Sequence, residues 1–144
     1  MVQDFEQHFN FLDLAEIIQL TNNNADRETI KNTMENMIGE KILVIMAKIP
    51  TGDLFSLLGQ KQIKSVKYSV GNPFTAQKLF SKNLTTGNFV PFTVNIYAVQ
   101  DSTIVEYIKP SSLMEQIGPD AETHVIGNAL DIEMQRIIDA IREN

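Results

Sequence analysis

Residues 67–113 constrain the fold of this chain more than any other stretch. They begin in an alternating run that stops at Gly71, continue through Asn72-Pro73 into an amphipathic segment, and end in two further apolar runs before Pro110. Alternation of apolar and polar residues is typical of strands with one buried face. Asn followed by Pro is typical of a helix start, since the N–H that Pro lacks would have no partner in the first turn. The stretch therefore predicts a strand, a helix and a β-hairpin in that order.

The hairpin is predicted from residues 92–98 and 103–109, which flank the polar turn 100–102. Upstream, Val66, Tyr68 and Val70 alternate with polar residues and predict a strand over 65–70. Residues 41–49 are apolar, short and rich in Ile and Val, which indicates a buried strand that ends at Pro50.

Two helices follow from a 3.6-residue period. One begins after Asn24 or Asp26, carries apolar residues at positions 30, 34, 37 and 38, and stops at Gly39. The other repeats apolar residues at 130, 134, 137, 138 and 141 and is expected to cover the sheet.

The remaining segments give weaker signals. We interpret residues 14–20 as a strand followed by an Asn-rich turn, and residues 53–58 as a short helix laid on the core. Glycines and prolines punctuate residues 111–127, where we expect one helical turn at 113–117. Residues 1–13 suit either a short helix or a lead-in to a strand.

Together these segments predict an α+β fold: a single antiparallel β-sheet with helices packed on one face, in the order β-α-β-(short α)-β-α-β-β-α. We expect an N-terminal extension over residues 1–13 and one domain over residues 14–144. A chain of 144 residues with 43% hydrophobic residues is enough to bury a single core.

Charge and composition exclude several classes of function. The net charge of -6 argues against nucleic acid and anionic membrane surfaces as partners, because both reward clustered Lys and Arg. The absence of cysteine excludes disulfides, thiol nucleophiles and thiolate zinc sites. No apolar run approaches about 18 residues and the N-terminus is acidic, so we expect a soluble, cytoplasmic protein.

The central stretch resembles the family called domain of unknown function 302. The resemblance rests on Gly71-Asn72-Pro73 after a strand, on the turn 88–91 before an apolar strand that ends near Tyr97, and on Tyr107 three residues before Pro110. It covers roughly residues 14–144. It implies an antiparallel sheet with helices on one face, similar to TATA-binding-protein-like arrangements, that often occurs as a homodimer. The family has no agreed catalytic residues, so the resemblance implies no catalytic site.

Four residues are candidates for binding a ligand. The helix that begins at Asn72 has free N–H groups in its first turn, which can hold an anion. Tyr97, Tyr107 and Lys109 come from the expected hairpin and could present donors over the same cleft. The structural alternative is that Asn72 only caps its helix and that Tyr and Lys lie at the rim of the core.

Other polar groups point to catalysis or metal binding less specifically. His8 and His124 lack partners at metal-ligand spacing, and a mobile acidic loop accounts for Asp120, Glu122 and His124 more simply than an ion site does. Ser111 and Ser112 follow Lys109 without the local pattern of a nucleophile. We therefore expect no metal and no cofactor.

The leading hypothesis is a non-enzymatic module that dimerises and binds a small apolar or anionic molecule between the sheet and the helices that begin near Asn72 and Asn128. The alternative is a protein-protein interaction or self-association domain, with Phe5, Phe9 and Phe11 on an arm that crosses to a second chain. A third hypothesis is an acid-base enzyme that uses Glu106 or Asp101.

Overall fold

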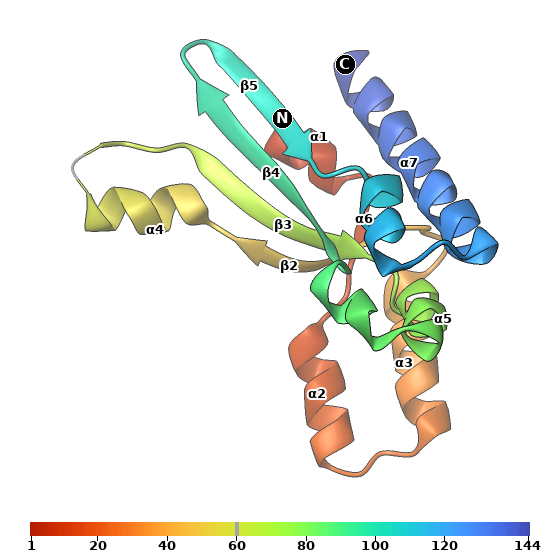
Figure 1. Ribbon diagram of the computed structural model, residues 1–144. Coiled ribbons are helices and arrows are strands. Elements are labelled where there is room, and N and C mark those ends of the chain that lie inside the picture. Colours follow the sequence, from red (N-terminus) through yellow and green to blue (C-terminus); the bar gives the residue numbers. More distant parts are fainter. Residues whose placement is uncertain (60) are drawn as a thin grey trace.

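The chain forms one open sheet with helices against it (Figure 1). The structure is a computed structural model that describes residues 1–59 and 61–144. Its elements are α1 (Val2–Glu6), β1 (Asn10–Phe11), α2 (Leu14–Asn22), α3 (Arg27–Ile38), β2 (Val44–Ile49), α4 (Thr51–Leu58), β3 (Ser65–Gly71), α5 (Pro73–Lys82), the 3-10 helix η1 (Leu84–Asn88), β4 (Phe92–Val99), β5 (Ser102–Tyr107), α6 (Pro110–Ile117) and α7 (Ala121–Arg142). The expected α+β class is confirmed.

The sheet order is β1-β2-β3-β4-β5. β1 runs parallel to β2, and the other neighbouring pairs are antiparallel. The register of β3 and β4 pairs apolar side chains with one another: Val66 with Ile96, Tyr68 with Val94, and Val70 with Phe92. This apolar face is covered by α7, whose residues Leu130, Met134, Ile137 and Ile141 are buried in the same core. The opposite face carries polar residues such as Lys67 and Glu106, which stay exposed.

The N-terminal residues contribute to this core. Phe5 and Phe9 are buried, and the Phe5 ring centroid lies 4.7 Å from that of Phe9 and 5.1 Å from that of Tyr68. The Tyr68 hydroxyl donates a 2.7 Å hydrogen bond to Glu6, which also pairs with Lys48. Burial acts to raise the pKa of Glu6, but the Lys48 and Tyr68 hydrogen bonds outweigh it and hold that pKa below its usual value. A charged carboxylate thus ties α1 to β2 and β3.

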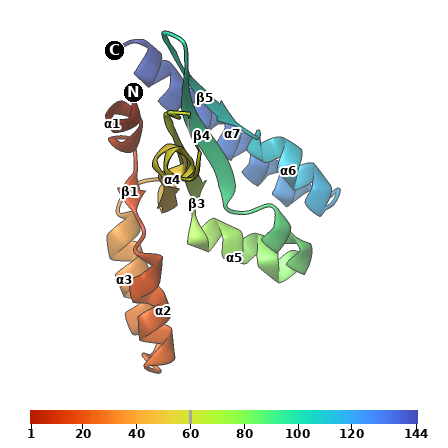
Figure 2. The ribbon, with the colours of Figure 1, turned by 90° about the vertical axis from the view of Figure 1, so that its left-hand side faces the viewer.

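The expected strand over residues 14–20 is wrong, because this segment is α2. The Asp13 side chain accepts a hydrogen bond from the backbone N–H of Glu16, which satisfies a donor of the first turn. Ile17 and Leu20 are half-buried one turn apart, whereas Ile18 is exposed. α2 and α3 lie side by side and extend away from the sheet (Figure 2). A short apolar run does not by itself separate a helix from a strand.

Most other expectations are confirmed. α3, β2, β3, α5 and the hairpin of β4 and β5 form where the sequence places them. Asp26, and not Asn24, caps α3 by accepting a 2.7 Å hydrogen bond from the Thr29 N–H. Gly39 ends that helix with a φ of 59°, a backbone conformation that favours glycine.

The short helix expected at residues 53–58 forms as α4, but it does not lie on the core. Its four large apolar side chains, Leu54, Phe55, Leu57 and Leu58, are 47%, 54%, 84% and 83% exposed. Gly52 is its one buried residue, and a Cβ there would lie 2.5 Å from the backbone nitrogen of Ser65. The helix therefore touches β3 closely at its first turn and leaves its apolar side chains uncovered.

The region 111–127 is more helical than expected. It forms α6 and the first two turns of α7, so Asn128 lies inside α7 and not near its start. Gly127 is buried in α7 because α6 passes close to it: a Cβ there would lie 2.7 Å from Cγ of Met114. This glycine permits helix contact and does not break the helix. Within the described residues, no helix has both the length and the apolarity needed to cross a bilayer.

Candidate functional site

The start of α5 is fixed by the side chain of Asn72. Its Oδ1 accepts hydrogen bonds from the backbone N–H groups of Phe74, at 3.0 Å, and Thr75, at 3.3 Å. Its Nδ2 donates to the carbonyl of Ile42 at 3.0 Å. Pro73 occupies the first helical position, as expected from the sequence. Asn72 therefore joins α5 to the segment that leads into β2.

An apolar cleft of about 400 Å³ lies beside this helix start. It is enclosed by the end of β3, by α5, by the segment that enters β4 and by α7. Its lining residues are mainly apolar: Met46, Val70, Gly71, Asn72, Pro73, Thr75, Ala76, Gln77, Leu79, Phe80, Val90, Pro91, Phe92 and Leu130. The Val90–Pro91 peptide bond in this wall is cis. We refer to this cavity as the α5 cleft.

The α5 cleft lies between the sheet and α5, and the binding site predicted from the sequence lies between the sheet and two helices, of which α5 is one. Of the two helices expected to flank it, α5 does so at its start, whereas α7 reaches it through Leu130. Its polar lining is limited to Asn72, Thr75 and Gln77. Because Oδ1 of Asn72 already accepts the N–H groups of Phe74 and Thr75, these donors are not turned toward an anion. The chemistry of the cleft suits an apolar group.

The structure does not bring the four predicted site residues together. Asn72 lines the α5 cleft, whereas Tyr97 lines a groove of about 790 Å³ beside α4. Tyr107 pairs with Val94 and packs against the core that α7 covers, and it also borders a groove of about 540 Å³ on the open face of the sheet. Lys109 follows β5, is 68% exposed, and has its Nζ 3.8 Å from Oδ2 of Asp131.

The two tyrosines have local partners of their own. The Tyr97 hydroxyl donates a 3.0 Å hydrogen bond to Glu106, and this bond raises the pKa of Tyr97. Burial, followed by the negative charge of Asp131, raises the pKa of Tyr107. Both hydroxyls therefore stay protonated at neutral pH.

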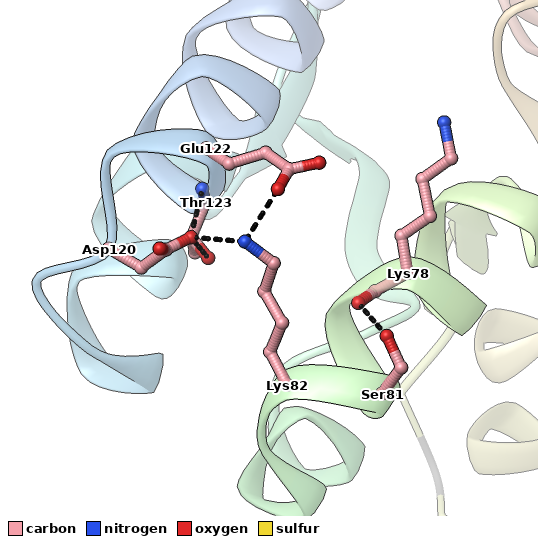
Figure 3. Close-up of polar contacts among 6 residues, drawn as sticks. All are labelled: Lys78, Ser81, Lys82, Asp120, Glu122 and Thr123. Carbon is pink, nitrogen blue, oxygen red and sulfur yellow. Dashed lines mark hydrogen bonds and ion pairs between the residues drawn. The ribbon is translucent and has the colours of Figure 1, made fainter.

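The acidic segment at residues 120–124 is a helix start and not a loop. Asp120 caps α7 by accepting hydrogen bonds from the backbone and side chain of Thr123, each at 3.0 Å. Lys82 at the end of α5 reaches between two carboxylates, 2.7 Å from Asp120 and 2.6 Å from Glu122 (Figure 3). The Lys82 hydrogen bond and then the Thr123 N–H lower the pKa of Asp120 to about 2. This cluster ties α5 to α7.

The other polar candidates have structural partners. The Ser112 hydroxyl donates to the carbonyl of Lys109 at 2.7 Å, and the Ser111 N–H donates to Asp131 at 2.9 Å. Both bonds satisfy backbone groups at the start of α6. Within the described residues, no three His, Asp or Glu side chains gather where they could hold a metal ion.

Among the four site residues predicted from the sequence, Asn72 alone lines the α5 cleft, and most of the cleft wall was not predicted. Met46, Val90 and Leu130 line it from three separate parts of the chain. Each has an apolar side chain in an apolar stretch, so its sequence context does not distinguish a cavity wall from a core position.

Comparison with known proteins agrees with the fold. The model of the family described as "Domain of unknown function DUF302" matches residues 18–141. A crystal structure of an uncharacterized conserved protein DUF302 from Bacillus stearothermophilus is similar to this chain with a TM-score of 0.61 and 20% sequence identity. The similarity covers 78% of this chain and 88% of that one. No curated protein matches the sequence.

Proposed function

The chain belongs to the DUF302 family of domains of unknown function, and we propose that it is a non-enzymatic module that binds a small molecule in the α5 cleft. The observation that carries this proposal is a cleft of about 400 Å³ whose walls are mainly apolar. Ligand pockets of proteins are typically about 300–1,000 Å³ and combine apolar walls with a few polar groups. The α5 cleft has that size and that composition.

The expected ligand is a small apolar molecule or the apolar end of a larger one. Leu79, Phe92 and Leu130 lie deep in the fold, since each is less than a tenth exposed, and all three line the cleft. Thr75 and Gln77 contribute the polar groups besides Asn72. Removing apolar ligand surface from water contributes about 25 cal/mol per Å². Binding an anion instead would require the first-turn N–H groups that Asn72 already occupies.

Self-association is the second part of the proposal, in which the module is a homodimer in the cytoplasm. The hypothesis of an N-terminal arm that crosses to a second chain loses support. Phe5 and Phe9 are buried in the core of their own chain, and of the three phenylalanines only Phe11, at 49%, is exposed. The exposed apolar side chains of α4 give a specific reason to expect that another protein surface packs against them.

The acid-base alternative rests on Glu106 and Asp101, and neither residue lines the α5 cleft. Glu106 is exposed and accepts the hydrogen bond from Tyr97. These contacts supply no reason to prefer catalysis over binding.

A thermal-shift comparison of three proteins tests the binding proposal. The probes are 1-decanol and decanoate, which share an apolar chain and differ in charge. Ala76→Leu adds a larger side chain to the cleft wall, and Ala129→Leu makes the same change at an exposed position of α7. We expect both probes to raise the Tm of the wild type and of Ala129→Leu, because a ligand that binds only the native state stabilises it. Decanol should do so at a lower concentration than decanoate.

The Ala76→Leu protein should keep its own Tm within a few degrees and show no further rise with either probe. Equal rises in all three proteins would place binding outside the α5 cleft. No rise in the wild type would refute the proposal for apolar chains.

A further inference from the structure

The most unusual surface of the molecule is the α4 patch, which we define as Leu54, Phe55, Leu57, Leu58 and Ile63. These five side chains are between 41% and 84% exposed. Isolated exposed leucines are common, but four large apolar side chains exposed on one short helix, with Ile63 beside Phe55 and Leu57 in the groove walls, are of the kind that marks an interface.

The helix that carries the patch is held firmly. The hydroxyls of Thr51 and Ser65 are 2.8 Å apart, and the Ser56 hydroxyl accepts a 2.8 Å hydrogen bond from the N–H of Ile63. Gly52 lies against the backbone of β3. The first turn of α4 is therefore fixed to β3, and the middle of α4 is fixed to the segment just before β3, while Leu57 and Leu58 stay exposed.

Two grooves flank α4. One, of about 540 Å³, lies on the open face of the sheet and has Phe55, Ile63 and Ile108 among its walls. The other, of about 790 Å³, has Leu57 and Ile63 in its walls and lies toward α1. The exposed leucines thus lie beside grooves whose walls combine apolar and polar side chains. Such an arrangement can be complementary to itself when two copies meet about a twofold axis.

The charges at the grooves are balanced. The first groove has Lys67 and Glu106 in its walls, and the second has Lys64 and Asp53. Among the ion pairs of the described residues, none involves any of these four side chains. Both signs on one surface suit an isologous interface, because a lysine of one copy can then face a carboxylate of the other.

The same balance disfavours a lipid surface. Anionic bilayers attract clusters of Lys and Arg, whereas here each lysine has a carboxylate in the same groove and the whole chain carries a net charge of -6. A stable interface buries about 800 Å² on each partner, more than four leucine- or phenylalanine-sized side chains supply, so the groove walls must take part.

From these observations we infer that the occupant of the α4 patch is a second copy of this chain. Leu57 and Leu58 of each protomer lie in the groove of about 540 Å³ on the open face of the other protomer's sheet. This inference rests on the self-association part of the proposed function and is independent of the α5 cleft. In this arrangement Lys67 and Glu106 of one protomer face the opposite charges of its partner. The open face of the sheet is then partly covered in the dimer.

The test is the mass in solution of three proteins, measured by light scattering after size exclusion from about 1 to 100 μM. The wild type should be a dimer whose Tm rises with protein concentration, and Leu57→Glu/Leu58→Glu should be a monomer with an unchanged far-ultraviolet spectrum and a Tm that does not depend on concentration. Leu84→Glu is the matched control, because Leu84 is 82% exposed but lies in η1. It should remain a dimer.

A second measurement uses the absence of cysteine from the chain. In the proposed dimer the two α4 helices lie near the twofold axis, so Leu58→Cys should form an intermolecular disulfide under mild oxidation and Leu84→Cys should not. A monomeric wild type, or a dimer that persists in Leu57→Glu/Leu58→Glu, would overturn the inference. So would a monomer that floats with phosphatidylglycerol vesicles through the same two leucines. None of these outcomes depends on decanol or decanoate, so failure here and failure of the cleft proposal are distinguishable.

Discussion

Substitution of Asn72 separates the contribution of its capping oxygen to stability from that of its amide donor. Asn72→Ala removes the cap of α5 and the bond to Ile42. Loss of a helix cap costs about 1 kcal/mol, and loss of a hydrogen bond between a side chain and the backbone costs about 1 kcal/mol more. The free energy of unfolding should therefore fall by about 2 kcal/mol. Asn72→Asp keeps the acceptor for Phe74 and Thr75 and loses only the donor to Ile42, so its loss should be below about 1 kcal/mol.

Urea denaturation followed by circular dichroism measures both effects. With an m-value of about 2 kcal/mol per molar, a loss of about 2 kcal/mol moves the midpoint by about 1 M. Asn88→Ala is the control, since Asn88 is exposed at the end of η1. Equal midpoints for Asn72→Ala and Asn72→Asp would show that the capping oxygen contributes nothing to the free energy of unfolding, contrary to this prediction.

The remaining predictions concern helix contacts and pH. Gly127→Ala should lower the Tm despite its gain of about 1 kcal/mol in helix propensity, because its Cβ would lie 2.7 Å from Cγ of Met114. Gly52→Ala should lower the Tm further, because its Cβ would meet backbone atoms at 2.5 and 2.6 Å, which no side-chain movement relieves. Asp120→Asn should be less stable than the wild type at neutral pH, and this difference should disappear as the pH falls from about 4 to about 2. The reason is that the pKa of Asp120 is about 2 when folded and about 3.9 when unfolded, so its stabilisation is present above pH 4 and is lost as the pH falls through the folded value. Melting curves of both proteins at each pH measure this difference in stability. A difference that persists unchanged to pH 2 would contradict the role of the Asp120 carboxylate.

Much of the fold could be predicted because local patterns agreed with tertiary packing. The alternation of Val66, Tyr68 and Val70 is the buried face of β3, and Asn72-Pro73 begins α5 through the expected cap. The errors arose where local patterns were ambiguous. The run at residues 14–20 is too short to separate strand from helix, and the signal that favours a helix is the capping residue Asp13 just before it.

Other errors reflect contacts between distant segments. Gly127 ends the stretch in which the sequence predicts little helix, whereas it lies inside α7 where α6 approaches. The apolar residues of α4 predict a helix packed on the core. Burial depends, however, on which other segments of the chain pack against a helix, and the sequence of α4 alone does not specify those segments. This helix exposes its leucines.

The candidate site could be located only in part. Asn72 lines the α5 cleft, but Tyr97, Tyr107 and Lys109 lie elsewhere, because the hairpin carries them to other faces and ends of the sheet. The order of residues along a hairpin does not specify which cavity each side chain reaches.

Methyl NMR during titration with 1-decanol shows whether the α5 cleft binds an apolar group. We predict that the first signals to shift, and to saturate, are the methyls of Met46, Ala76, Leu79, Val90 and Leu130, all of which line the cleft. The methyls of Leu84 and Ile132, exposed elsewhere, should not move. Saturating shifts confined to residues outside the cleft, or no shifts at all, would contradict the account.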